Sequence, residues 1–193
     1  RDIYAISASE LFSALRSLID QYSDVDIAFL PSFLGVDIRV SSKNKTSYDA
    51  FLKDVNQKID GYIFSNNNAS LEEVVAKTLI KNKISISTAE SCTGGLIADR
   101  LTNISGVSAV YKGSIIAYSN DQKTKLLNVS QKILNKCGAV SEETAIEMAI
   151  GVQEKFSTNI GISTTGIAGP TGGTITKPIG LVFIGLAYNG YSK

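Results

Sequence analysis

The stretch Thr88–Gly95 reads TAESCTGG and predicts a strand that turns into a helix. It follows residues 84–87, ISIS, whose alternation is typical of a strand, and precedes residues 96–101, LIADRL, which predict a helix. Such a turn points backbone N–H groups at whatever lies beyond it, and Ser91 adds a hydroxyl. This combination suits an anionic ligand, a developing oxyanion, or both.

The turn at Ser91 also has simpler interpretations. A serine before a glycine pair is often only a helix N-cap, and a helix start can bind an anion without any catalysis. The phosphate-loop pattern GxxxxGK[ST] is missing, and no GxGxxG follows a strand. The turn by itself therefore leaves structural, binding and catalytic roles open.

Composition excludes several classes of protein. The chain has 193 residues, of which 44% are hydrophobic and 19% charged, as is ordinary for a soluble globular protein. No apolar run approaches the roughly 20 residues that span a membrane, and no secretory signal is visible. The net charge of +1, without a basic block, does not favour broad capture of nucleic acid. Because the chain begins at Arg1 without Met, we expect it to be a fragment of a longer protein.

Cysteine and histidine usage narrows the chemistry. Cys92 and Cys137 are far apart and form no CxxC motif, which favours reduced thiols in a cytoplasmic protein. Histidine is absent, so a Ser-His-Asp triad, a Cys-His dyad and histidine metal sites are all excluded. Any serine nucleophile must take its base from Lys, Tyr, Asp or Glu. We expect no metal and no cofactor.

The chain divides into two predicted domains. Residues 1–66 read as a small α+β domain of order α-β-β-α, and residues 67–193 as a second domain, with a polar boundary near residues 65–70. In the first domain the predicted helices are 10–22 and 48–59, and the strands 25–30 and 36–40, separated by Pro31-Ser32-Phe33.

The second domain alternates strands and helices, which predicts a three-layer (α/β/α) fold. Its first helix begins with a capping-box pattern, Ser70 followed by Glu73. The predicted strands are 84–88, 109–117, 159–165 and 180–188, and the later helices are 94–102, 119–127 and 142–155.

Three segments that could take part in binding or catalysis lie at the ends of predicted strands. They are the Ser91 turn, the stretch from Tyr111 to Lys123, and the loop that begins at Thr165. Ligands of α/β sheets usually bind beyond the carboxyl ends of the strands, so a shared site is plausible.

Each later segment has a functional and a structural interpretation. Tyr118 and Lys123 are most simply a packing tyrosine and a solvated lysine, but a Ser-Tyr-Lys set can activate a hydroxyl without histidine. The loop Gly166–Gly173 holds four glycines and either wraps a phosphate or is purely structural.

Taken together, these motifs closely resemble the C-terminal domain of the CinA (competence/damage-inducible) family. The resemblance covers residues 70–190 and is carried in fixed order by AESCTGG at 89–95, YSN at 118–120 with Lys123 and the pair Leu126-Leu127, GAVS at 138–141, and TGIAGP at 165–170. Residues 1–66 resemble more loosely the KH-like middle domain of that family. The family's N-terminal domain would lie before Arg1.

The resemblance implies a reaction, the deamidation of nicotinamide mononucleotide to nicotinic acid mononucleotide and ammonia. It implies Ser91 as the nucleophile, Tyr118 and Lys123 as the base and proton-shuttle pair, and Thr165 as a supporting residue. The backbone at Thr93, Gly94 and Gly95 fits an oxyanion hole. The remaining expected substrate contacts are Tyr111, Asn120, Gly166, Ala168 and Gly169.

Two departures from the family pattern and two alternatives accompany this hypothesis. Thr171 and Asn128 stand where the family usually has glycine. The first alternative is a non-catalytic nucleotide-binding or dimerisation module of a larger CinA protein, since the family suggests a homodimer. The second is binding of RNA or single-stranded DNA by residues 1–66, which is disfavoured because the GXXG signature of KH domains is absent there. Which glycine-rich turn holds the phosphate stays open.

Overall fold

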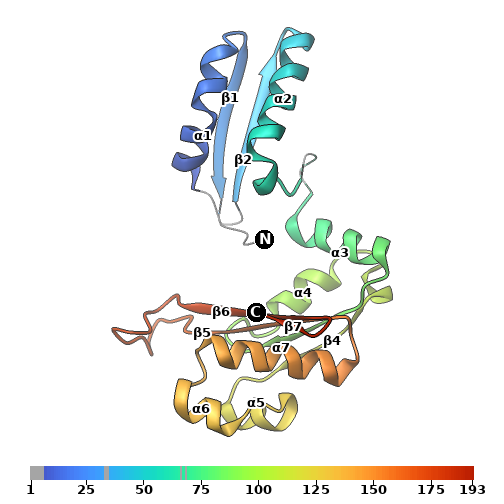
Figure 1. The fold of residues 1–193 in the computed structure, drawn as a ribbon, viewed down its shortest axis with the longest axis vertical. Helices are drawn as coiled ribbons and strands as arrows, with labels where there is room; N and C mark the ends of the chain where they lie inside the picture. The colour runs from blue at the N-terminus through green and yellow to red at the C-terminus, as the bar shows by residue number, and fades with distance from the viewer. Residues whose placement is uncertain (1–6, 33–34, 66, 68) are drawn as a thin grey trace. The chain divides into compact units, whose positions relative to one another are not determined.

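The computed structural model describes residues 7–32, 35–65, 67 and 69–193. The chain divides into two compact units, Arg1–Asn68 and Ala69–Lys193 (Figure 1). The predicted boundary after residue 66 lies two residues before this division. Of the residues used in the sequence predictions, Arg1, Phe33, Asn66 and Asn68 lie outside the described residues.

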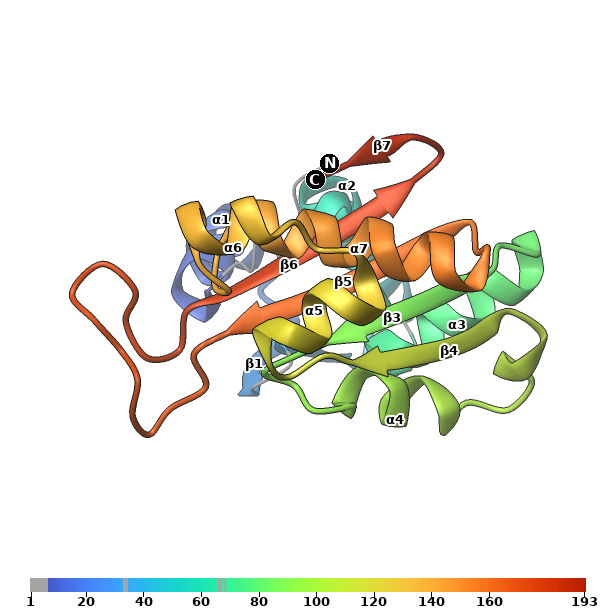
Figure 2. The ribbon, with the colours of Figure 1, turned by 90° about the horizontal axis from the view of Figure 1, so that it is seen from below.

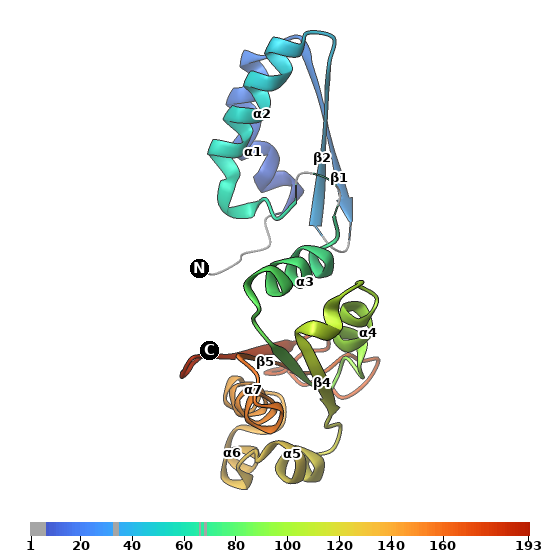
Figure 3. The same ribbon diagram turned by 90° about the vertical axis from the view of Figure 1, so that its right-hand side faces the viewer.

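The first unit is built in the predicted order α-β-β-α. Strands β1 (Val25–Ser32) and β2 (Gly35–Ser42) pair antiparallel, with Val25 opposite Ser42. Helices α1 (Ala8–Gln21) and α2 (Lys45–Ile59) lie on one side of this ribbon, and the short η1 (Asp60–Tyr62) follows (Figure 3). Their apolar faces meet in a core of Leu11, Leu15, Phe51, Val55 and Ile59. The KH-like character of this unit stays a prediction.

The second unit is a five-stranded sheet between two layers of helices. The strand order is β4-β3-β5-β6-β7, with β3 parallel to β4 and β5, and with β6 and β7 antiparallel (Figure 2). The strands are β3 (Ile86–Glu90), β4 (Tyr111–Ile116), β5 (Ile160–Gly166), β6 (Val182–Tyr188) and β7 (Tyr191–Ser192). The helices are α3 (Leu71–Asn82), α4 (Leu96–Thr102), η2 (Val107–Ala109), α5 (Asn120–Leu127), α6 (Gln131–Cys137) and α7 (Glu142–Phe156).

Two apolar clusters hold the layers together. One joins β3 to α5, α6 and α7 and contains Ala89, Leu127, Leu134, Met148 and Val152. The other joins β3 to α3 and η2 on the opposite face and contains Ala76, Leu79, Ile86, Val107 and Val110. Figure 3 shows α5, α6 and α7 on one side of the sheet and α3 and α4 on the other. The three-layer prediction is therefore confirmed, with a mixed sheet.

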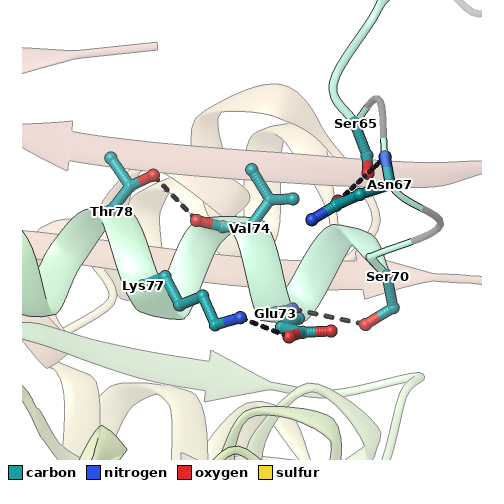
Figure 4. A network of polar contacts seen from close by, with 7 residues as sticks. All are labelled: Ser65, Asn67, Ser70, Glu73, Val74, Lys77 and Thr78. Carbon is teal, nitrogen blue, oxygen red and sulfur yellow. Dashed lines mark hydrogen bonds and ion pairs between the residues drawn. The ribbon is translucent and has the colours of Figure 1, made fainter.

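The start of α3 shows which part of its predicted cap forms. The Ser70 hydroxyl accepts a hydrogen bond from the Glu73 backbone N–H at 3.3 Å, as an N-cap should (Figure 4). The Glu73 carboxylate does not reach back to Ser70; it pairs with Lys77 one turn later. The reciprocal half of the predicted capping box is thus wrong, because an i,i+4 ion pair competes for the same carboxylate.

The parallel strands bring the three segments of interest to one edge. Glu90 ends β3 and lies opposite Ile116 of β4 and Thr164 of β5. The Ser91 turn, the residues after β4 and the loop after β5 therefore leave the sheet side by side. Among the residues described here, no helix has both the length and the apolar character needed to cross a membrane.

Candidate active site

Ser91 and Lys123 form a buried pair at this edge. Lys123 lies one turn inside α5, whose N-cap is Ser119, and only 1% of the residue is exposed. Its Nζ donates to the Ser91 Oγ at 2.9 Å, to the Ala117 carbonyl at 2.8 Å and to the Tyr118 carbonyl at 3.1 Å. The structure thus joins two of the predicted catalytic residues, which lie 32 positions apart in the chain.

Burial disfavours the charged form of Lys123, whereas three oxygen atoms accept hydrogen bonds from its amine. Burial lowers the pKa of the Lys123 amine below its ordinary value. A neutral amine keeps two hydrogens, which suffice for the two carbonyl oxygens. In that form the lone pair of the amine would be directed at the Ser91 hydroxyl, which would then become the donor. The geometry therefore suits transfer of the hydroxyl proton from Ser91 to Lys123.

The carboxylate of Glu90 lies at the start of α4, on the face of the sheet opposite Lys123. The residue is fully buried, and its carboxylate accepts hydrogen bonds from the Thr93 hydroxyl at 2.7 Å and from the backbone N–H groups of Gly95 at 2.9 Å, Ile97 at 3.1 Å and Ala98 at 2.9 Å. A carboxylate is favourable there because a helix N-terminus carries partial positive charge. The helix start that the sequence offered to an external anion is therefore already filled.

This contact corrects the predicted oxyanion hole. The N–H of Gly95 is bonded to Glu90, and the N–H of Gly94 donates to the Ser91 carbonyl at 3.2 Å. The two glycines instead provide backbone conformation, with φ of 60° and 105°. In the part of the chain that the structure describes, the N–H groups of Cys92 and Thr93 form no hydrogen bond. They are the N–H groups of this turn that bind no other described residue.

Tyr118 and Asn120 lie at the surface beside the pair. Tyr118 is 78% exposed, and its hydroxyl makes no hydrogen bond to any described residue; its backbone carbonyl is what binds Lys123. Asn120 is the exposed first residue of α5. The structure thus brings Lys123 but not the Tyr118 hydroxyl to Ser91, and the roles of Tyr118 and Asn120 stay predictions.

Tyr111 lies away from Ser91. It begins β4, at the opposite end of the strand from Tyr118, and its hydroxyl is 3.0 Å from the Thr88 hydroxyl. Burial raises the pKa of the Tyr111 phenol. Because β3 and β4 are parallel, the start of β4 is far from their shared carboxyl edge. The substrate contact expected for Tyr111 stays a prediction, because the hydroxyl reaches Thr88, two residues before the end of β3.

Thr165 supports the neighbouring segment. The residue is 1% exposed, and its hydroxyl donates to the Ala139 carbonyl at 2.7 Å. The same segment is held from the other side by Thr144, whose hydroxyl donates to the Gly138 carbonyl at 2.8 Å. Ser141 then caps α7. In this conformation Thr165 positions residues 138–141 and forms no hydrogen bond to Ser91.

The loop between β5 and β6 leaves the sheet at the same edge (Figure 2). At the base of the loop, the Ile167 backbone N–H donates a hydrogen bond to the Leu181 carbonyl at 2.9 Å. The predicted contacts Gly166, Ala168 and Gly169 follow directly after Thr165. No group of three or more His, Cys, Asp or Glu side chains that could hold a metal ion is found among the described residues.

Sequence reasoning missed Glu90, although the chain carries a signal for it. Glu90 lies six residues before the first residue of α4 and is separated from it by a turn with two glycines. A tight turn brings such a residue back to the helix start, where acidic groups are stabilising. Thr164 was also missed; its hydroxyl is 2.7 Å from that of Thr93 and so extends the Glu90 network to β5.

Fold and site together define a three-layer α/β protein that pairs a serine with a buried lysine at the carboxyl ends of parallel strands. The sequence profile described as the CinA C-terminal domain matches residues 68–193. The chain belongs to the CinA family. The CinA-like protein of Dictyoglomus turgidum is 48% identical over 194 residues, which is 97% of this chain and 47% of that protein. The CinA-like protein of Kosmotoga olearia is 55% identical over 138 residues, 72% of this chain and 34% of that protein.

Solved structures agree with this assignment. The competence/damage inducible protein CihA from Agrobacterium tumefaciens is 41% identical with a TM-score of 0.60, over 68% of this chain and 80% of that one. A competence-damaged protein (CinA) superfamily protein from Escherichia coli is 34% identical with a TM-score of 0.61, over 64% of this chain and 72% of that one. The chain spans about half the length of the curated relatives it matches.

Proposed function

We propose that this chain hydrolyses the carboxamide of nicotinamide mononucleotide, releasing nicotinic acid mononucleotide and ammonia. The observation that supports it most is the 2.9 Å contact between Lys123 Nζ and Ser91 Oγ in a buried setting. The choice of substrate rests on the resemblance of the motifs to the CinA family. The two cysteines are free thiols, which agrees with the cytoplasm as the proposed compartment.

The proposed reaction has two halves. Lys123, as a neutral amine, takes the proton of the Ser91 hydroxyl while the oxygen attacks the carboxamide carbon. The negative oxygen that develops faces the N–H groups of Cys92 and Thr93. The tetrahedral intermediate then collapses, the C–N bond breaks, and the protonated lysine returns its proton to the leaving ammonia.

Water completes the cycle. A water molecule gives its proton to Lys123 and attacks the acyl-Ser91 ester, and the serine leaves with the proton restored. Tyr118 remains the proposed proton shuttle, from its exposed position beside the carbonyl that binds Lys123. Thr165 acts at a distance by holding the Ala139 carbonyl.

The test is ammonia release from nicotinamide mononucleotide by the 193-residue chain without added metal. We expect turnover in the parent protein and a loss of several orders of magnitude in Ser91→Ala, since the nucleophile is removed. The matched control is Ser119→Ala, which removes a neighbouring hydroxyl that only caps α5. If the parent binds the nucleotide but releases no ammonia, the enzyme hypothesis fails.

The alternative is a nucleotide-binding and dimerisation module of a larger protein. An exposed apolar strip on β6 favours it, because Val182, Ile184 and Leu186 are 42%, 70% and 36% exposed on the strand. We propose a second copy of the chain as the occupant of this strip, in agreement with the family's dimer. Light scattering should report a dimer that Ile184→Glu dissociates; a monomeric parent protein would rule this out.

A further inference from the structure

The structure offers an answer to where the phosphate of a mononucleotide would lie. One glycine-rich turn, at the start of α4, already holds the buried carboxylate of Glu90 on three backbone N–H groups. A phosphate placed there would meet a negative group at short range and find those donors occupied. The phosphate should therefore bind elsewhere on the same edge of the sheet.

The loop after β5 has more unpaired donors than the α4 turn, where the described structure leaves those of Cys92 and Thr93. Within the described residues, no hydrogen bond is formed by the backbone N–H groups of Ala168, Gly169, Thr171, Gly172 or Gly173. Successive unpaired N–H groups in a glycine-rich loop form concavities that bind anions. The loop follows Thr165 directly and so begins beside the Ser91 turn.

The same loop contains a lysine, Lys177, in the part that precedes β6. Lys177 is half-buried, and its Nζ donates to the Cys137 carbonyl at 2.7 Å. Cys137 lies two residues before Ala139, whose carbonyl Thr165 holds. Lys177 makes no ion pair with any carboxylate in the described part of the chain. Its charge thus lies against the segment that Thr165 positions, without a negative partner.

We propose that Lys177 is the phosphate-recognising residue of this site, and that the phosphate monoester of the substrate binds between Lys177 and the loop N–H groups. The proposal rests on the proposed function for the identity of the substrate. It concerns a specificity residue, because Lys177 contacts the phosphate and not the reacting carboxamide. On binding, its ammonium would give up the hydrogen bond to a backbone carbonyl and donate to a charged phosphate oxygen, which is a stronger acceptor.

A simpler role for Lys177 is to cap α6, since a cation at a helix C-terminus is favourable. The two roles differ in what they predict for ligands. A capping lysine affects ligands with and without a phosphate to the same degree. A phosphate-recognising lysine discriminates between them.

The experiment compares nicotinamide mononucleotide with nicotinamide riboside, which lacks only the phosphate. Binding is measured by calorimetry on the 193-residue chain carrying Ser91→Ala, so that no turnover occurs. Lys177→Met should weaken binding of the mononucleotide by about 10- to 100-fold, the usual effect of losing a charged hydrogen bond. The ratio of mononucleotide to riboside affinity should fall by most of that factor, and Lys177→Arg should restore much of it.

Lys112→Met is the matched control. Lys112 also donates to a backbone carbonyl, that of Ala109 at 3.0 Å, but it lies on β4 near the amino end of the strand. It should leave the affinity ratio unchanged. Where the riboside binds too weakly to measure, inorganic phosphate is titrated as a competitor of the mononucleotide. Lys177→Met should then weaken the competition by phosphate.

An unchanged mononucleotide affinity in Lys177→Met, or an equal loss for both ligands, overturns the proposal. Lys177→Gln provides a second variant if thermal melting shows that Lys177→Met does not fold. Because binding is measured without turnover, the phosphate site can stand even if the parent chain releases no ammonia. The two hypotheses therefore fail separately.

Discussion

At the scale of single residues, the charged form of Lys123 is in an unfavourable place. The side chain is withdrawn from water, and none of the ion pairs in the described chain includes it. The Ser91 hydroxyl and two carbonyl oxygens accept hydrogen bonds from its amine, and the Cys92 thiol interacts with it electrostatically. Desolvation outweighs the opposing effect of Cys92 and lowers the pKa of Lys123, which is what makes this amine a proton acceptor.

The pH dependence of activity should report this amine. Ammonia release should rise with pH as Lys123 loses its proton, with a midpoint below the ordinary lysine value of 10.5. The measurement is kcat/KM against pH for the parent chain. Lys125→Met serves as the control, because this exposed lysine of the same helix pairs with Asp121 and should leave the profile unchanged. A rate independent of pH would contradict the role of Lys123.

The free energy of unfolding should also depend on pH through Lys123, and the sign of this dependence is defined. Since the folded pKa of Lys123 lies below the unfolded one, the unfolded chain binds more protons between the two values, and the free energy of unfolding rises with pH there. Urea unfolding of the parent and of Lys123→Met measures this. The free energy of unfolding of the parent should rise relative to that of Lys123→Met as the pH increases toward 10.5. A shift of the opposite sign would mean that the lysine is stabilised as a cation.

Glu90 gives a second prediction at this scale. Glu90→Gln keeps the size of the side chain but replaces one acceptor oxygen with an N–H₂ group, which faces backbone donors. We expect a loss of about 1–3 kcal/mol in the free energy of unfolding, because buried N–H groups are left without a partner. Asp121→Asn, which breaks an exposed ion pair on α5, is the control and should change stability by about 0.5 kcal/mol or less. Equal effects in urea unfolding would contradict the buried network.

At the scale of elements, the contact between α5 and α7 positions the lysine. A Cβ on Gly151 of α7 would lie 1.9 Å from the Leu127 carbonyl oxygen, which belongs to the last residue of α5. The glycine therefore lets the two helices approach closely. Since α5 carries Lys123, the position of the amine depends on a residue of a different helix.

Gly151→Ala should push α5 away from α7. We expect a loss of about 1–3 kcal/mol in stability, as for other overpacked contacts. Ammonia release should fall as well, because Lys123 moves relative to Ser91. Gly61→Ala is the comparison, since a Cβ there has no atom within 4 Å. A stable Gly151→Ala protein with full activity would show that the helices can separate without moving the site.

At the scale of the whole molecule, the candidate site lies entirely in the second unit. Ser91, Lys123, Thr165 and Lys177 all belong to Ala69–Lys193, and this unit has its own apolar clusters. The first unit has a separate core. Each unit thus has the apolar interior that independent folding requires.

A chain of residues 69–193 should therefore fold alone and keep the kcat for ammonia release of the 193-residue chain. Circular dichroism and the ammonia assay measure the two parts of this prediction. The complementary chain, residues 1–68, is the control and should release none. A folded 69–193 chain with a much lower kcat would show that the first unit contributes to the site.

Local patterns in the sequence determined most of the elements and their order. Apolar periodicity marked the α-β-β-α unit and the alternating strands and helices, because each segment must bury one face. The short helix α6 and the two-residue β7 were not predicted; β7 is too short to carry any periodicity. The resemblance to the CinA family singled out Ser91 and Lys123 as reacting residues, whereas the spacing of the residues alone left their roles open.

The tertiary structure decided what each of these side chains touches. It paired Lys123 with Ser91, aimed Glu90 at the α4 turn in place of a ligand, left the Tyr118 side chain at the surface, and brought Lys177 to the end of α6. The Glu90 contact is local, but the contacts of Lys123 with Ser91 and of Lys177 with Cys137 do not follow from neighbouring residues. These two contacts depend on segments that the fold brings together from distant positions, and all of them depend on which partner gives a polar group its hydrogen bonds.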